Sequence, residues 1–372
     1  MFKRAFYYIT HWESWHWFAK YILIGPVWLW YCFRARSFWF FSSSNPGITF
    51  GGYLGETKEE VYQLLPPGTY PGSVFISPLF SLTEVVRRMD EKGLAFPVAA
   101  KAASGIMGFM FRRIDSIEQL RQYHSYMPFN YIVQELVTYP IEVSVFYYRY
   151  PHHLRGNITG FVKKELPEVI GDGIHSLWEL IQAHPGVQFK LEEMRSKHAK
   201  RLYDVLEEGE RYPLSHAINL SRGGRLISLA DQKDDQLLHL FDSLSHHSGQ
   251  LLFGRYDIRC QSIESLKNRK DYKILEFNGC GGEPHHVYGN GNSLWKACRI
   301  LLHHWAILYK ISRYNHLNGF PRWPHKKGVA FLKKSVQHVV RLKKLDKEFS
   351  FHAEITSHSL YKSSLQPVEN YV

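Results

Sequence analysis

Cysteine is scarce in this sequence and is not clustered. The chain of 372 residues holds four cysteines, at positions 32, 260, 280 and 298, with no C-x-x-C spacing. This pattern argues against a disulfide framework or a structural zinc site, and it favours a reducing, cytoplasmic compartment. The 21 histidines do not change that expectation, because the side chains of adjacent histidines point apart and chelate one ion poorly.

Long hydrophobic runs are also absent. The apolar stretch 21–33 has about half the length of a membrane-spanning helix, and Gly25-Pro26 interrupts it. No cleavable signal-peptide pattern precedes it. A nucleotide-binding P-loop is absent as well, because residues 55–58 read G-E-T-K where that motif needs G-K-[ST]. The glycines in 47–55 predict a tight turn or, alternatively, a turn that binds an anion.

Acidic residues are rare at both ends of the chain. Residues 1–41 carry five basic residues and one acid, residues 310–347 carry eleven basic residues and one acid, and 42–309 sum to zero. A nucleic-acid enzyme more often carries its positive charge along the working groove, so this distribution argues against nucleic acid as a partner.

Each basic end allows two interpretations. Residues 1–41 contain 17 of the 57 aromatic residues and six of the ten tryptophans. This arm is expected either to lie on the cytoplasmic, anionic face of a membrane or to pack over the body or in a dimer interface. The tail, 313–372, contains a basic amphipathic segment that suits an anionic membrane or an acidic partner, or that docks on the body as a solvated helix.

The most informative stretch is 253–282. Two apolar runs rich in β-branched and aromatic residues predict strands, one carrying Arg255 and Asp257 and the other Glu276 and Asn278. If these strands are antiparallel neighbours, two carboxylates and an amide oxygen converge, and such ligands suit Mg²⁺. The alternative is an ion-pair network at a sheet edge. The polar segment between the runs is expected to be a loop or a hairpin connection.

The order R-x-D followed by E-x-N resembles the end of the catalytic domain in the ATP-grasp superfamily, in particular in carboxylate–amine ligases such as D-alanine–D-alanine ligase. The resemblance implies an α+β ATP-grasp fold that holds ATP between two sheets. It implies that Asp257, Glu276 and Asn278 bind one or two Mg²⁺ ions, or Mn²⁺, and that Arg255 acts in the reaction.

Four further elements follow the family's order over residues 81–312. The resemblance assigns Lys101 and the loop Ser104–Gly108 to phosphate binding. The residues expected to bind are Lys101, Ser104, Gly105 and Gly108. It assigns Glu135, Leu136 and Val137 to the adenine hinge and Glu142 to the ribose. It makes Lys163 or Lys164 a second phosphate lysine, with Lys163 preferred. The resemblance places Asn219 and Arg222 near the triphosphate or acyl phosphate, and Glu283 and His285 near the second substrate.

The implied reaction is ATP-dependent ligation of a carboxylate to an amine through an acyl phosphate. A kinase acting on a hydroxyl and a non-catalytic, membrane-surface nucleotide-binding protein are the alternatives. The chain divides into an arm (1–41), a short segment (42–80), an ATP-grasp domain (81–312, with a nucleotide lid at 95–135) and the tail. Residues 42–80 are too few for the Rossmann-like domain that precedes the catalytic part of D-alanine ligases, so acceptor specificity does not transfer.

Overall fold

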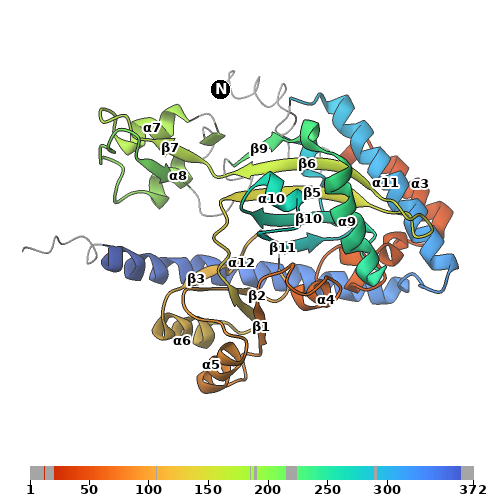
Figure 1. The fold of residues 1–372 in the computed structure, drawn as a ribbon, viewed down its shortest axis with the longest axis horizontal. Helices are drawn as coiled ribbons and strands as arrows, with labels where there is room; N and C mark the ends of the chain where they lie inside the picture. Colours follow the sequence, from red (N-terminus) through yellow and green to blue (C-terminus); the bar gives the residue numbers. More distant parts are fainter. Residues whose placement is uncertain are drawn as a thin grey trace, which may run out of the picture. The chain divides into compact units, whose positions relative to one another are not determined.

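The computed structural model describes Trp12 and residues 21–105, 107–184, 186–187, 191–214, 224–288 and 291–361, with side chains up to residue 349. The chain divides into two compact units, which are treated separately below (Figure 1). Unit 1 comprises Met1–Tyr53, Glu60–Tyr70 and Val137–His325. Unit 2 comprises Leu54–Glu59, Pro71–Leu136 and Lys326–Val372.

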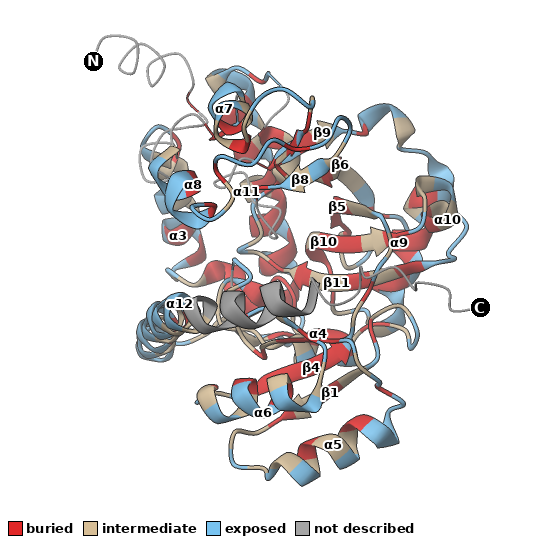
Figure 2. Ribbon diagram, turned by 90° about the vertical axis from the view of Figure 1, so that its left-hand side faces the viewer, coloured by how far each residue is buried: buried red, intermediate tan, exposed pale blue. Residues whose placement is uncertain are grey.

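Unit 1 is built on a five-stranded antiparallel sheet in the order β11-β10-β5-β6-β9. Its strands are β5 (Ile141–Tyr148), β6 (Asn157–Glu165), β9 (Arg225–Ser228), β10 (Phe253–Cys260) and β11 (Tyr272–Asn278). Figure 2 shows the central strands β5 and β10 largely buried. Tyr256 packs against Phe241 of helix α9 (Asp235–Ser248) on one face, and Phe146 packs against His304 of α11 (Leu294–Leu317) on the other. Helices therefore cover both faces.

The N-terminal part of unit 1 packs along α11. Helix α3 (Gly25–Ala35) starts at Gly25-Pro26, because proline suits the first turn, where its missing N–H is not needed. The ring centroids of its Trp28 and of Trp305 are 5.0 Å apart, and its Tyr31 stacks on Tyr309 with ring centroids 4.7 Å apart. Three shorter elements follow: η2 (Phe40–Ser43), η3 (Thr49–Gly52) and α4 (Lys58–Gln63), which belongs to unit 1 from Glu60 onward.

A small satellite core forms around the hairpin β7 (Glu168–Ile170) and β8 (Arg211–Pro213). It includes α7 (Leu177–Ala183) and α8 (Leu191–Lys197). The sequence predicts a charged surface helix over 192–206, and this is wrong in its second half. There the chain runs along the start of α7, with Trp178 N–H donating to the Leu202 carbonyl, and Leu202 and Leu206 are buried.

The connection between β10 and β11 is also more regular than the expected loop. It holds a short helix, α10 (Ile263–Lys267), because the Ser262 hydroxyl caps the backbone N–H of Ser265 at 2.9 Å. The sequence also predicts a helical run over 231–252, before β10, and the observed helix α9 is shorter. It follows the 3-10 turn η6 (Ala230–Gln232), begins after the cap Asp234 and ends at Gly249, whose φ of 68° stops the helix.

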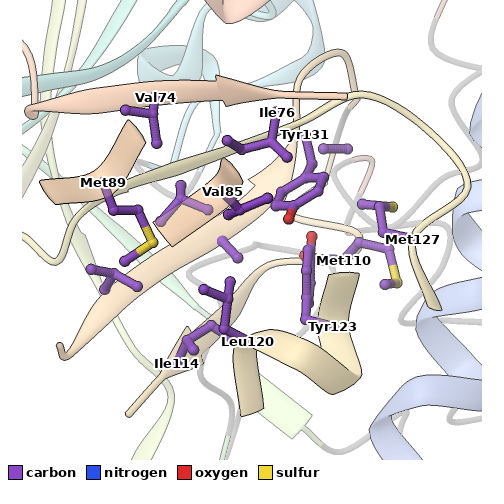
Figure 3. Packing of buried hydrophobic residues seen from close by; sticks show 14 of the residues in the cluster. Val74, Ile76, Val85, Met89, Met110, Ile114, Leu120, Tyr123, Met127 and Tyr131 are labelled. Atoms are coloured by element: carbon purple, nitrogen blue, oxygen red, sulfur yellow. The ribbon is translucent and has the colours of Figure 1, made fainter. Parts of the chain in front are cut away.

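Unit 2 has a four-stranded antiparallel sheet in the order β1-β4-β2-β3. Its strands are β1 (Ser73–Ile76), β2 (Val98–Ala102), β3 (Arg112–Ile114) and β4 (Tyr131–Glu135). Helices α5 (Leu82–Glu91) and α6 (Ile117–Tyr126) are capped by Ser81 and Ser116, as the sequence predicts. Figure 3 shows the core that they enclose with the sheet, in which Tyr123 and Tyr131 face one another.

The C-terminal helix α12 (His325–Tyr361) belongs to unit 2 from Lys326 onward. Leu342 is fully buried in the core of this unit, and Asp346 pairs with Arg112 at 2.9 Å. Of the interpretations open for the tail, the described part shows a helix docked on the body. The α+β class predicted from the sequence is confirmed, and no helix in the described residues is long and apolar enough to cross a membrane.

Candidate active site

A row of polar side chains crosses one face of the five-stranded sheet. Strands β10 and β11 are antiparallel neighbours, with Arg255 opposite Asn278 and Asp257 opposite Glu276. Residues directly opposite each other in such a pair project to the same face, and so do residues two apart along a strand. The structure therefore brings together the four residues that the R-x-D and E-x-N patterns single out. The sheet extends this face through Ser144, which lies opposite Asp257 on β5.

Asp257 is the centre of the row. Its side chain is 8% exposed, and its two oxygens lie 3.0 Å from Lys164 Nζ and 3.1 Å from Arg255 Nη2. Asn278 Nδ2 donates to the same carboxylate at 3.2 Å. Burial alone would raise the pKa of Asp257, but Arg255 and Lys164 hold this pKa below its usual range. The carboxylate is therefore ionised and fixed in orientation.

Glu142 continues the row at the edge of β5. Its carboxylate lies 3.2 Å from Lys164 Nζ and 3.4 Å from Arg259 Nε. Arg259 also donates to the Val137 carbonyl at 3.1 Å. The residue assigned to ribose and the hinge carbonyl thus both have partners within unit 1.

The two lysines of β6 lie on opposite faces of the sheet. Lys164 is 7% exposed and bridges Asp257 and Glu142, whereas Lys163 is 37% exposed and pairs with Glu165 at 2.9 Å. Strand alternation places only one of two successive residues on the polar face. The structure brings Lys164, rather than the preferred Lys163, into the row.

The loop after β11 closes one end of the row. Arg255 Nη1 donates to the Glu283 carbonyl at 2.8 Å, and the Glu283 carboxylate accepts from the hydroxyls of Tyr21 and Tyr288 at 3.0 and 3.2 Å. This loop includes η7 (His285–Val287). Burial and Arg255 lower the pKa of His285 well below its usual value, so the imidazole is neutral. Both residues assigned to the second substrate therefore lie beside Arg255.

Asn45 is a structural residue of this site that the sequence did not reveal. It is fully buried, its Nδ2 donates to the Gly51 and Phe253 carbonyls, and its Oδ1 accepts from the N–H groups of Leu252 and Phe253. It thus fixes the first residues of β10, two positions before Arg255. The Asn-Pro-Gly turn signal at 45–47 marks a bend, and nothing local indicates a contact two hundred residues away.

The glycine-rich turn packs against the loop after β11. Cys280 and Gly281 donate their N–H groups to the carbonyls of Gly51 and Gly52, at 3.1 and 3.0 Å. A Cβ on Gly279 would lie 2.5 Å from the Gly51 carbonyl oxygen, so no side chain fits there. Of the two interpretations of this turn, the structure shows a tight packing turn.

In unit 2, Lys101 lies on the sheet face opposite the core. It follows Ala100 and precedes Ala102, which both pack in the core, so alternation turns Lys101 away from it. The segment after it bends sharply, with φ of 58° at Met107 and 68° at Gly108. The predicted phosphate loop, including Ser104 and Gly105, is therefore a turn between two strands of one hairpin.

The predicted hinge lies at the end of β4. Glu135 is the last residue of the strand, it is exposed, and it exchanges hydrogen bonds with the backbone of Gly72. Leu136 is the last residue of this segment of unit 2, and Val137 begins the next segment of unit 1. The predicted Asn219 and Arg222 lie outside the described residues.

The donor set of the row suits a hard cation. In the part of the chain that the structure describes, no three His, Cys, Asp or Glu side chains gather into a metal-binding group. The row offers two carboxylates, Asp257 and Glu276, and the amide of Asn278. Mg²⁺ is commonly bound by one or two carboxylates together with water and phosphate oxygens, so these three side chains fit it.

No protein-family model and no curated protein matches this sequence. Similar solved structures include a bifunctional glutathione synthetase from Pasteurella multocida (16% identity, 66% of this chain and 35% of that chain, TM-score 0.40). Another is a D-Ala:D-Ser ligase from Enterococcus faecalis (13% identity, 68% of this chain and 61% of that chain, TM-score 0.39). A third is a D-alanine–D-alanine ligase from Bacillus anthracis (10% identity, 71% of this chain and 69% of that chain, TM-score 0.40).

One of these solved structures is a ligase of the type that the motif order resembles. The chain spans only 35% of the length of the glutathione synthetase and 61% of the length of the D-Ala:D-Ser ligase. At these identities and TM-scores the likeness carries no argument about this chain. The function must therefore be argued from the residues.

Proposed function

We propose that this protein is an ATP-dependent, Mg²⁺-requiring ligase that joins a small-molecule carboxylate to an amine. The observation that carries the proposal is the buried carboxylate of Asp257, ionised between Lys164 and Arg255 and directly opposite Glu276. Maintaining an ionised carboxylate in a buried position requires this set of partners. The order of motifs along the sequence further supports the proposed ligase activity.

The proposed reaction has two steps. A substrate carboxylate oxygen attacks the γ-phosphorus of ATP, the bond to the bridging oxygen breaks, and ADP leaves with that electron pair. An amine nitrogen then attacks the acyl carbon, inorganic phosphate leaves, and the nitrogen loses a proton. Catalysis of such transfers consists mainly of positioning and of neutralising charge.

The residues have distinct tasks in this proposal. Asp257, Glu276 and Asn278 would hold Mg²⁺, which when bound neutralises phosphate charge. Arg255 would stabilise the negative charge that develops at the reacting oxygens, and its bond to the Glu283 carbonyl orients it. Lys101, in unit 2, keeps its sequence-based assignment to phosphate, as do Asn219 and Arg222 to the acyl phosphate.

A matched pair of variants tests the proposal. Glu276→Gln removes one proposed metal ligand, and Glu165→Gln makes the same change on the opposite face, where Glu165 pairs with Lys163. We expect Glu276→Gln to lose ADP formation with its thermal unfolding unchanged, and Glu165→Gln to keep it. Full turnover in Glu276→Gln would overturn the assignment.

The same assay separates the reaction classes. Panels of amino acids, polyamines and polyols are screened for release of ADP and of free phosphate. A ligase releases both in equal amounts and needs an amine, whereas the kinase alternative forms ADP with a hydroxyl compound and releases no phosphate. Nucleotide binding without any turnover would favour the non-catalytic alternative.

A further inference from the structure

Helix α3 and its flanking residues present a stripe of large apolar side chains to solvent. Its members lie along 22–38, three of them on α3 itself, and each is more than half exposed. They are Ile22 (59%), Leu23 (52%), Leu29 (60%), Trp30 (55%), Phe33 (74%) and Phe38 (58%). We refer to these six residues as the α3 stripe. Such a concentration on one short segment marks an interaction surface.

The opposite side of α3 is already used. Trp28 and Tyr31 pack against Trp305 and Tyr309 of α11, and Cys32 and Ala35 are buried. Figure 1 shows α3 lying beside α11 within unit 1. The inner contacts fix the rotation of the helix, so the stripe residues on α3 stay outward. A helix that is apolar on both sides normally has both sides covered.

The charged residues of 21–55 and of α11 have one sign. Neither α3 nor α11 contains an aspartate or a glutamate, and residues 21–55 contain no acid at all. Arg34 and Arg36 are exposed at the C-terminal end of α3. Lys310 and Arg313 are exposed on the half of α11 that packs beside it. The surface that would cover the stripe is therefore expected to be apolar inside and anionic at its rim.

We propose that the α3 stripe docks this protein on the surface of an anionic lipid bilayer. Tryptophan and phenylalanine favour the headgroup and acyl boundary, and arginines beside them pair with lipid phosphates. The 11 residues of α3 are too few to cross a bilayer, so the helix lies in the interface. The proposal is independent of the proposed ligase activity. A second protein copy on the stripe would place the arginines of both copies close together, which charge repulsion disfavours.

Vesicle flotation of the full-length protein tests this proposal. The vesicles are phosphatidylcholine alone or phosphatidylcholine mixed with phosphatidylglycerol. We expect flotation with the anionic vesicles only. Trp30→Ser/Phe33→Ser should reduce the bound fraction about tenfold or more, since two large apolar side chains leave the bilayer. Leu79→Ser/Leu154→Ser is the matched control, because these leucines are 91% and 86% exposed elsewhere, and it should float like the parent.

The outcomes are separable. Equal flotation of parent and Trp30→Ser/Phe33→Ser, no flotation of the parent, or equal binding to neutral vesicles would each overturn the proposal. A fall in molecular mass of Trp30→Ser/Phe33→Ser in light scattering, with flotation unchanged, would assign the stripe to a second copy. Should that variant fail to fold, Arg34→Gln/Arg36→Gln keeps the apolar stripe and must still weaken binding to anionic vesicles.

Discussion

The polar row of unit 1 and the hairpin turn of unit 2 are supported in different ways. In unit 1, ion pairs join side chains of β5, β6 and β10, so the sheet itself assembles the row. In unit 2, the turn after Lys101 is supported by a helix from the far end of the chain. His338 bonds to the Ser104 carbonyl at 2.9 Å, and Asp346 accepts from the N–H of Met110 at 2.9 Å.

The difference shows how each part can be altered. The row depends on buried ion pairs, in which removing one charge leaves another buried without a partner. The turn depends on partly exposed contacts, in which a lost partner is replaced by water at lower cost. Unit 1 is therefore expected to respond to mutation by losing stability, and unit 2 by losing local order.

The largest expected effect comes from the two lysines of β6. Lys164→Met leaves Asp257 and Glu142 buried without their shared cation, and we expect it to cost about 3–5 kcal/mol of unfolding free energy. Lys163→Met removes only a half-exposed pair and is expected to change stability by less than about 0.5 kcal/mol. Urea denaturation of both variants measures this contrast. Equal costs would mean that the polar row does not depend on buried charge.

The next effect concerns acid sensitivity in unit 1. His304 is 3% exposed between Phe146 and His286, and neither of its ring nitrogens has a hydrogen-bond partner among the described residues. Burial lowers the pKa of His304 well below its usual value, and it lowers the pKa of His286 to about 4. The unfolded chain binds protons on these histidines below about pH 6.5, whereas the folded chain does not.

Stability should therefore fall as the pH drops from about 6.5 toward 4, by about 1.4 kcal/mol per pH unit for each histidine that stays neutral. His304→Leu removes one such group and should lessen the loss between pH 6.5 and 5 by about 2 kcal/mol. His303→Gln, at the exposed neighbouring position, is the control. Unfolding midpoints at the two pH values give the comparison, and an unchanged pH slope in His304→Leu would contradict the prediction.

A smaller effect is expected in unit 2. Asp346→Asn weakens the contacts to Met110 and Arg112, at a cost of about 1–2 kcal/mol. Because the contacts hold the turn, amide exchange of residues 107–111 should accelerate more than exchange in β5. Glu348→Gln changes an exposed side chain two residues later and should leave amide exchange in 107–111 and in β5 unaffected. Uniform acceleration across both units would show that α12 stabilises the chain as a whole.

The sequence predicted the parts of the fold and site that depend on local periodicity. Alternating apolar residues predicted β10 and β11, and with them the convergence of Asp257 and Glu276. The choice between Lys163 and Lys164 needed the register of β6, which one strand cannot reveal. Asn45 and Asp346 act across about two hundred residues, so no local pattern indicates their partners. The short helix α10 was missed because its polar residues resemble those of a loop.

The smallest predicted effect lies at helix ends, where the two units should behave alike. Ser176 caps α7 in unit 1 through reciprocal hydrogen bonds, in which each of Ser176 and Glu179 accepts from the backbone N–H of the other. Ser81 caps α5 in unit 2 by accepting one hydrogen bond from the Glu84 N–H. Since caps act within one turn of chain, Ser176→Ala and Ser81→Ala should each cost about 1 kcal/mol, whichever unit carries them. Thermal unfolding of both variants tests this. A cost several times larger at one serine would mean that its helix end also bears a long-range contact, and the contrast between the units would then extend to their local structure.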